Sequence, residues 1–250
     1  MDSRRLNGIR AIAVALMVVA ALGVGARADA GPIQLGFILD SSGSIGTTGW
    51  NTIRTGLANA ILTEIPLGGL YEVSVVTFSA ALGQTIGNVV VTDAASRTAL
   101  ANQVAALNYL GSTTNFAAAF DAMARLLNPA GKSYVNFATD GQANVDTADT
   151  IPKLNLLKAA ADNISVEGIG TGIDTGFLQG TVCYPGPCDL TSPYNFPAQG
   201  FYVGVVDAQG YADAIGNKIQ TVVTAPDPGS SLLLLGMGLV ALRAWRKRWQ

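Results

Sequence analysis

The 250-residue sequence contains no histidine and only two cysteines, Cys183 and Cys188. Without histidine the chain cannot build a Ser-His-Asp triad. The cysteines are so close in sequence that a local disulfide is the simplest interpretation in an exported chain, and such a pair leaves no thiol as a nucleophile. The same two absences disfavour zinc and copper, which prefer nitrogen and sulfur ligands. Any metal site must therefore be built from oxygen atoms.

Charged residues are also scarce, at 13% of the chain. Between Gly31 and Thr224 there are 7 Lys and Arg against 14 Asp and Glu, which gives this part a net charge of −7. The remaining basic residues gather near the two ends. Because an acidic domain repels phosphate backbones, we expect no nucleic-acid partner.

The beginning of the chain has the layout of a secretory signal peptide. Arginines precede an apolar run from Ala11 to Ala26, and small residues then offer cleavage after Ala28 or Ala30. We predict that residues 1–30 are removed by signal peptidase. A retained transmembrane anchor is the alternative, for which the apolar run is short.

Residues 31–224 are predicted to form one α/β domain, because strand-like apolar runs alternate with helical periods. The expected strands are 33–39, 71–78, 84–92, 132–138, 164–170 and 201–206, and the expected helices are 47–65, 93–107, 114 or 115–127, 150–162 and 207–223. This alternation predicts a doubly wound, Rossmann-like sandwich with a mostly parallel central sheet and helices on both faces. Strands 71–78 and 84–92 are expected to form a hairpin, which would place one antiparallel strand at the edge. Residues 171–200, which hold the cysteines and four prolines, are predicted to be an insertion loop.

Polar residues follow two of the predicted strands. Asp40-Ser41-Ser42-Gly43-Ser44 comes after the first strand, and Thr139-Asp140-Gly141 follows a later one. Ligands of doubly wound sheets bind beyond the carboxyl ends of the strands. Carboxylate and hydroxyl oxygens suit a hard divalent cation, Mg²⁺ first, with Mn²⁺ or Ca²⁺ as alternatives. A purely structural interpretation is that Asp40 caps the helix after Thr47 and that hydroxyls of residues 111–115 cap the helix at Phe116.

Together with Gly111-Ser112-Thr113-Thr114-Asn115, these motifs resemble the von Willebrand factor type A domains over most of residues 33–223. Those domains share a metal-ion-dependent adhesion site, built from Asp-x-Ser-x-Ser, a threonine before a helix and an aspartate in a Thr-Asp-Gly turn. The residues that match it are Asp40, Ser42, Ser44, Thr114 and Asp140.

The resemblance implies a role for each matching residue. Ser42 and Ser44 would bind the cation through their hydroxyls, and Thr114, Asp40 and Asp140 would bind directly or through water. Thr113 is the alternative to Thr114. Such a site leaves one coordination position for a carboxylate of a partner protein.

The end of the chain resembles the bacterial PEP-CTERM sorting signal. Pro226-Asp227-Pro228 precedes an apolar run at 230–242 and a basic terminus, with Asp227 in place of the usual glutamate. The resemblance implies that residues 225–250 insert transiently into the membrane and are cleaved by an exosortase. A plain membrane tail is the alternative.

These features together predict a non-enzymatic, adhesion-type module, exported to the periplasm, outer surface or extracellular matrix of a Gram-negative-type bacterium. The alternative is a structural surface protein that binds through the Cys183–Cys188 loop and has a stabilising or vestigial metal site. A hydrolase with a metal-activated water is disfavoured, because Asp140 is the one visible candidate for a general base.

Overall fold

The computed structural model describes residues 31–129 and 131–224. The predicted signal peptide (1–30) and sorting tail (225–250) lie outside these residues, so both stay predictions. Among the described ranges, no helix has the length and apolar character needed to cross a membrane.

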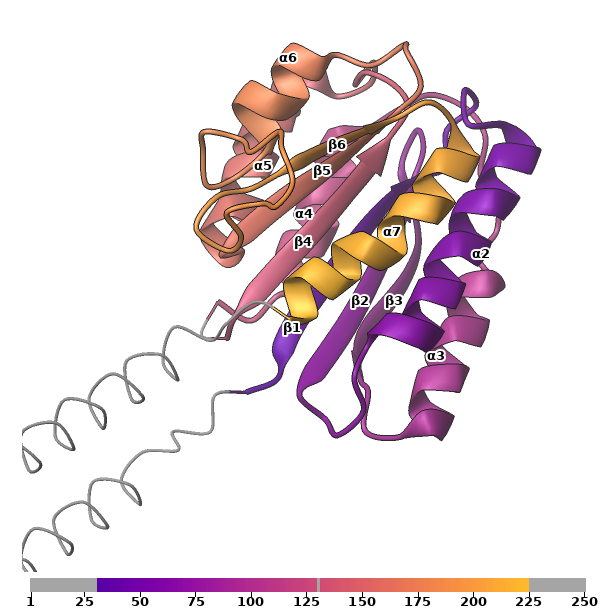
Figure 1. Ribbon diagram of the computed structural model, residues 1–250. Coiled ribbons are helices and arrows are strands. Elements are labelled where there is room, and N and C mark those ends of the chain that lie inside the picture. Colours follow the sequence, from indigo (N-terminus) through magenta and orange to yellow (C-terminus); the bar gives the residue numbers. More distant parts are fainter. Residues whose placement is uncertain (1–30, 130, 225–250) are drawn as a thin grey trace, which may run out of the picture. The chain divides into compact units, whose positions relative to one another are not determined.

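The centre of the domain is one six-stranded sheet (Figure 1). Its strands are β1 (Ile33–Asp40), β2 (Tyr71–Phe78), β3 (Leu82–Val90), β4 (Ser133–Thr139), β5 (Asn163–Ile169) and β6 (Tyr202–Val205). They lie in the order β3-β2-β1-β4-β5-β6, and every neighbouring pair is parallel except β2 and β3. The predicted fold, with a single antiparallel strand at one edge, is therefore confirmed.

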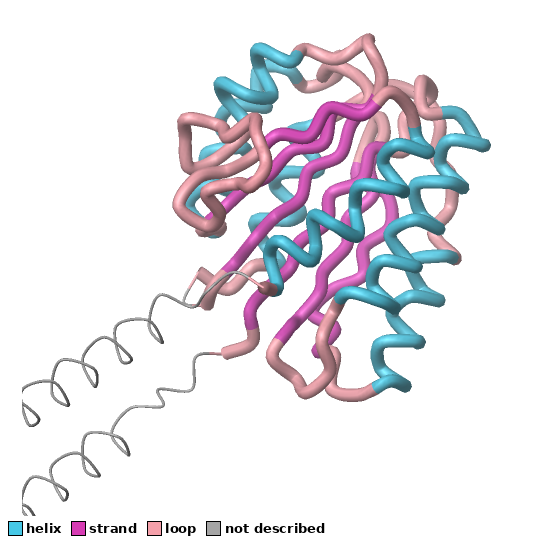
Figure 2. Tube along the Cα trace, in the orientation of Figure 1, coloured by secondary structure: helices cyan, strands magenta, loops and turns pink. Residues whose placement is uncertain are grey.

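Helices cover both faces of the sheet (Figure 2). They are α2 (Gly46–Glu64), α3 (Ala94–Ala105), α4 (Phe116–Leu126), α5 (Thr147–Ala160), α6 (Thr175–Phe177), the π-helix η1 (Leu178–Val182) and α7 (Ala208–Val223). Side chains of α2, α3 and α7 share one apolar core with the sheet, and those of α4 and α5 share the other.

Strand β1, at the centre of the sheet, is buried on both faces, which is why it reads as a nearly continuous apolar run, whereas the edge strand β3 is mostly exposed. In β1, Phe37 and Leu39 point into the α2 and α7 side, whereas Ile38 points to the α4 side. Helices α2 and α7 pack closely, since a Cβ added to Gly56 would lie 2.5 Å from the Cβ of Ala212. The same face of the sheet is thus covered by the first long helix and the last.

The segment 171–200 differs in part from the predicted loop, because it begins with α6 and η1. The carboxylate of Asp174 accepts a hydrogen bond from the backbone of Phe177 and so starts this helical stretch, and Leu178 and Val182 are buried against the α4 and α5 core. Two buried apolar residues one turn apart are too short a pattern to recognise beside four prolines. Cys183 and Cys188 are joined by a disulfide.

The remainder of this segment returns to the sheet. Tyr184 forms an antiparallel bridge with Ile164 of β5, and the ring of Tyr194 stacks on that of Phe201 at 4.3 Å between centroids. The segment therefore lies along the β5 and β6 side of the domain.

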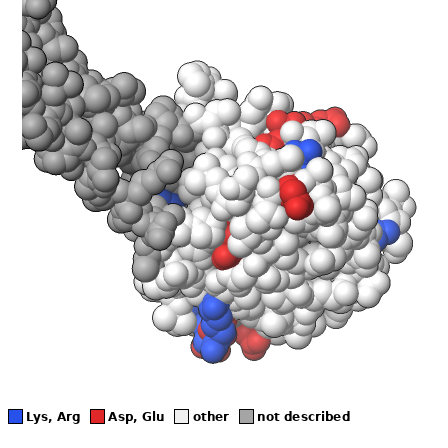
Figure 3. Space-filling model, turned by 90° about the horizontal axis from the view of Figure 1, so that it is seen from below, with Lys and Arg blue, Asp and Glu red and all other residues white. Residues whose placement is uncertain are grey.

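Seen from below, where the parallel strands begin, the described surface is mostly uncharged and shows a few Lys, Arg, Asp and Glu side chains (Figure 3). The residues with distinctive chemistry lie elsewhere, at the carboxyl ends of the strands and beneath α7.

Candidate metal centre

The strand order creates a switch point between β1 and β4. From β1 the chain builds outward through β2 to β3, and it then crosses to β4 and builds outward to β6. The loops that leave β1 and β4 lead to helices on opposite faces of the sheet. In doubly wound sheets a ligand crevice lies at this point, and we use the word crevice for this position at the strand ends. Asp40 ends β1 and Asp140 directly follows β4, so topology brings these two carboxylates to one place.

Asp40 is held in a fixed orientation at the bottom of this crevice. Its side chain is 1% exposed. One carboxylate oxygen accepts a hydrogen bond of 2.8 Å from the backbone N–H of Ser42, and the other accepts one of 2.6 Å from the hydroxyl of Thr139. Asp40 does not cap the following helix, because α2 has Ile45 at its N-cap and no side-chain cap. The capping interpretation of Asp40 is therefore wrong.

A chain of side-chain contacts joins the two motifs across the crevice. The hydroxyl of Ser44 donates to the carboxylate of Asp140 at 2.8 Å, and the hydroxyls of Ser42 and Ser44 lie 3.2 Å apart. Ser42 is buried and Ser44 is exposed. The cluster thus extends from a buried carboxylate to the surface.

Thr114 joins the cluster from the loop before α4. It is 3% exposed, whereas Thr113 is exposed to solvent. A Cβ built on Gly141 would lie 3.7 Å from the Thr114 hydroxyl and 3.9 Å from that of Ser44, so Gly141 leaves open the space that both hydroxyls face. All five residues expected from the sequence lie at this crevice.

Backbone hydrogen bonds hold the three loops together. Gly43 donates to the carbonyl of Ser112 at 2.7 Å, and Gly111 donates to that of Ser41 at 3.0 Å. The backbone N–H of Thr114 donates to the side chain of Asn144 at 2.8 Å. The hydroxyls are therefore positioned by the scaffold before any ligand arrives.

Burial dominates the electrostatics of the two carboxylates. Burial raises the pKa of Asp40 to about 6, although hydrogen bonds from Thr139 and Ser42 oppose the shift and the charge of Asp140 adds to it. Burial also raises the pKa of Asp140, against the hydrogen bond from Ser44. Among the described residues neither carboxylate takes part in an ion pair.

This donor set fits a hard divalent cation. It offers two carboxylates and three hydroxyls, all oxygen, around a space that Gly141 keeps free. The described residues contain no group of three or more His, Cys, Asp and Glu suited to a metal, so hydroxyl ligands would have to complete the shell.

Two supporting residues were not recognised in the sequence. Thr139 orients Asp40, and Asn144 positions Thr114. Asn115, one of the two caps expected from the sequence, caps α4 by accepting from the backbone of Ala118, so the cap is not a hydroxyl of this loop. The Asn115 amide also donates to Asp146 at 2.6 Å. Thr139 lies within the quoted Thr-Asp-Gly turn, which was the available signal, whereas the contacts of Asn144 depend on the folded loop.

Comparison with protein families decides the classification. The family model described as "von Willebrand factor type A domain" matches residues 34–192, which is more than half of the chain. The chain belongs to this family. No curated protein matches the chain as a whole.

Solved structures share the fold of this VWA domain at low sequence identity. Proximal thread matrix protein 1 from the mussel byssus is 14% identical with a TM-score of 0.60, over 77% of this chain and 48% of that one. The VWA protein of Catenulispora acidiphila is 16% identical with a TM-score of 0.61, over 76% and 42%. The pilus adhesin SpaC of Lactobacillus rhamnosus GG is 15% identical with a TM-score of 0.59, over 77% and 31%. The chain thus spans less than half the length of each.

Proposed function

We propose that this VWA domain binds Mg²⁺ and uses it to hold a carboxylate of a partner protein. The ligands would be Asp40, Ser42, Ser44, Thr114 and Asp140. The observation that carries the proposal is the convergence of two unpaired carboxylates and three hydroxyls at the switch point between β1 and β4. Mn²⁺ or Ca²⁺ would find the same oxygen ligands.

The five residues lie at different depths and would therefore have different roles. Buried Asp40 supplies negative charge from below, and its orientation is set by Thr139 and the backbone of Ser42. Ser44 and Asp140 lie nearer the solvent, so a partner would approach from their side. Because three of the five ligands are neutral hydroxyls, a bound cation would remain electrophilic enough to attract a further carboxylate.

Related structures and the chain's ends suggest where such binding would occur. One similar structure is the mussel-byssus protein with zinc in its metal-ion-dependent adhesion site (MIDAS) motif, and another is a pilus adhesin. With the signal peptide and sorting tail expected from the sequence, they support a non-enzymatic adhesion module of residues 31–224 at the surface of, or outside, a bacterial cell. Signal peptidase and an exosortase would process its two ends.

The alternative, binding through the Cys183–Cys188 loop, has less support. Aromatic residues of segment 171–200 pack against the domain itself, as Tyr194 does on Phe201 and Phe196 does on Tyr134. Leu190 is 56% exposed and is the large apolar side chain that this segment offers to a partner.

Metal binding is tested with Mg²⁺ alone. At a Mg²⁺ concentration about a hundredfold above Kd, the expected rise in Tm is about 5–10 °C by calorimetry. Asp140→Ala should show no rise. Asp149→Ala, which removes an exposed carboxylate beyond the crevice, is the matched control and should keep it. A wild-type Tm that Mg²⁺, Mn²⁺ and Ca²⁺ all leave unchanged would sink the metal site.

Partner recognition is tested with a random peptide library displayed on phage. We expect enriched peptides to contain Asp or Glu, to detach in EDTA, and to lose binding when that residue becomes Asn or Gln. Peptides that bind equally well in EDTA and are lost when residues 184–187 are replaced by glycines would support the alternative instead.

A further inference from the structure

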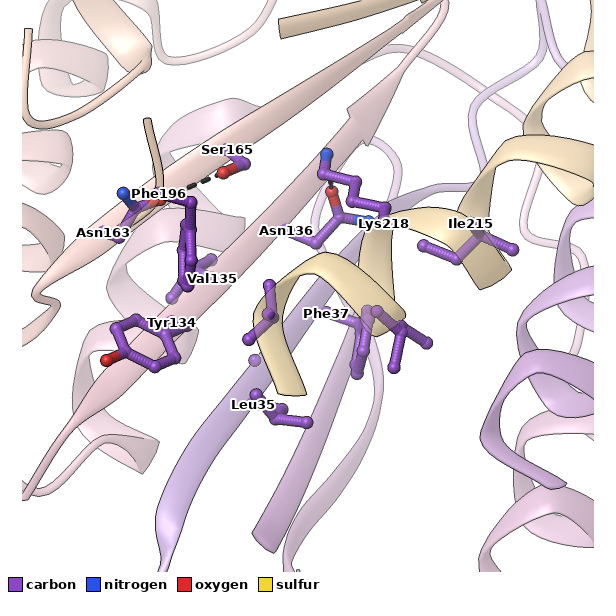
Figure 4. Close-up of a pocket in the computed structure, with 13 residues that line it drawn as sticks. Leu35, Phe37, Tyr134, Val135, Asn136, Asn163, Ser165, Phe196, Ile215 and Lys218 are labelled. Carbon is purple, nitrogen blue, oxygen red and sulfur yellow. Dashed lines mark hydrogen bonds between the residues drawn. The ribbon is translucent and has the colours of Figure 1, made fainter. Parts of the chain in front are cut away.

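Beneath α7 lies a second polar cluster, separate from the metal centre, which we call the Lys218 cluster: Lys218, Asn136 and Glu167. The Nζ of Lys218 donates a hydrogen bond to Oδ1 of Asn136 (Figure 4). The Nδ2 of Asn136 donates to Oε2 of Glu167 at 3.0 Å, and the same Oε2 lies 3.8 Å from the lysine nitrogen. An amine, a carboxamide and a carboxyl group are thus in mutual contact.

The surroundings shield this cluster from bulk solvent. The side chains of Lys218 and Glu167 are 4% and 0% exposed. The ring of Phe201 lies beside the amine, with its centroid 5.1 Å from Nζ. A cavity of about 30 Å³ borders Lys218 and Asn136 (Figure 4), which is enough for a single water-sized molecule.

Burial also favours the uncharged forms of the two ionisable groups. It lowers the pKa of Lys218 to about 8, against the attraction of Glu167. It raises the pKa of Glu167, against Lys218 and the hydrogen bond from Asn136. One carboxyl oxygen of Glu167 has no hydrogen-bond partner in the described part of the chain. Transfer of one proton from amine to carboxylate therefore yields a neutral, nucleophilic amine beside a carboxylic acid.

We propose that Lys218 and Asn136 become joined by an intramolecular isopeptide bond, with Glu167 as the catalytic residue that shuttles the protons. The three groups needed for amide exchange are in contact, in a buried site shielded from the bulk water that would compete with the amine.

The reaction balances without an external reagent. The lone pair of the Lys218 Nζ attacks Cγ of Asn136 and forms the new C–N bond. Glu167 accepts the proton that the attacking amine loses and delivers a proton to the departing Nδ2. The old C–N bond breaks, one ammonia molecule leaves, and Glu167 ends in its starting protonation state. Nothing is oxidised or reduced.

The bond would change the mechanics of the domain. It would link α7 to β4 across a sequence separation of 82 residues. The last helix of the described domain could then not be pulled from the sheet without breaking a covalent bond.

Mass spectrometry of the full chain tests the proposal. The intact mass should be lower than that of the unlinked chain by the mass of ammonia, about 17 Da. Trypsin should fail to cut after Lys218, and peptide 133–153 should stay joined to a peptide that begins at residue 159 and runs past Lys218. Separate peptides 133–153 and 159–218 as the sole products would overturn the proposal and leave the cluster as a buried ion pair.

Two variants assign the roles. Lys218→Met lacks the nucleophile, and Glu167→Gln keeps the size of the side chain but cannot exchange a proton in the same way. Each should give the full, unlinked mass. A linked Glu167→Gln chain would refute the role of Glu167, and a joined peptide in Lys218→Met would refute the choice of nucleophile. Circular dichroism shows whether each variant is folded. The intact mass of the wild-type chain shows whether the bond exists, whether or not the variants fold.

Discussion

Two polar clusters are associated with β4, and they differ in exposure and in charge balance. The candidate metal centre at Asp140 opens to solvent and holds two carboxylates that have no cationic partner among the described residues. The Lys218 cluster, around Asn136 earlier on the same strand, is buried and places an amine beside its carboxyl group. An open, uncompensated site suits an external ligand, whereas a closed, compensated site suits chemistry within the chain.

The largest expected effect is the loss of stability when the amine is removed from the buried cluster. Lys218→Met should lower the free energy of unfolding by about 4 kcal/mol, because the link that closes a long loop in the unfolded chain is lost. Urea unfolding measures it. Lys132→Met, at a lysine whose side chain is 56% exposed, should change stability by less than about 0.5 kcal/mol. A similar loss in both variants would contradict the special role of Lys218.

A second prediction concerns Asp40, whose charged form is disfavoured by burial. The folded-state pKa of Asp40 is raised from 3.8 to about 6, so the folded state binds the proton more tightly than the unfolded one. In EDTA, this group's stabilising contribution is therefore greatest below pH 4 and is lost as pH rises through about 6. Asp40→Asn should remove that dependence and stabilise the metal-free domain at pH 7.5 by up to about 3 kcal/mol.

Urea unfolding in EDTA at pH 5 and pH 7.5 checks this prediction, with Asp162→Asn as a control away from the metal centre. Mg²⁺ should stabilise the wild type at pH 7.5 but not Asp40→Asn. An Asp40→Asn variant that is less stable than wild type in EDTA at pH 7.5 would show that the hydrogen bonds to the carboxylate outweigh its burial.

The smallest expected effect is a difference in Mg²⁺ binding between variants of two neighbouring threonines. Thr114 is buried beside Ser44 and Thr113 is exposed. Thr114→Ala should weaken Mg²⁺ binding about tenfold by calorimetric titration, equivalent to about 1.4 kcal/mol, and Thr113→Ala should leave it unchanged. The reverse result would exchange their roles.

Much of the fold followed from the sequence, because strands buried on both faces and amphipathic helices leave distinct periods. Strand 71–78 agrees with β2 at both ends, and the hairpin places β3 at the edge as expected. The boundaries of α5 were less accurate, since it begins at Thr147 rather than Thr150. Helices α6 and η1 were missed because they are short and lie in a proline-rich segment.

The Lys218 cluster shows what the linear pattern cannot reveal. In β5, polar Asn163, Ser165 and Glu167 alternate with apolar residues, a period typical of a strand with one solvated face. In the structure that face is buried, under α7 at Glu167 and under residues 197–199 at Asn163. Nothing in the spacing of Lys218 indicates that its amine meets Asn136, which is 82 residues away.

The sequence by itself determined the strand and helix pattern, the oxygen-only chemistry of the metal centre and the order of its motifs. It could do so because these properties are carried by residue type and by short-range periodicity. The tertiary structure decided which residues meet: Thr139 with Asp40, Thr114 with Ser44, and Lys218 with Asn136. Those contacts depend on strand order and on the packing of α7 over the sheet, which join residues far apart in the chain.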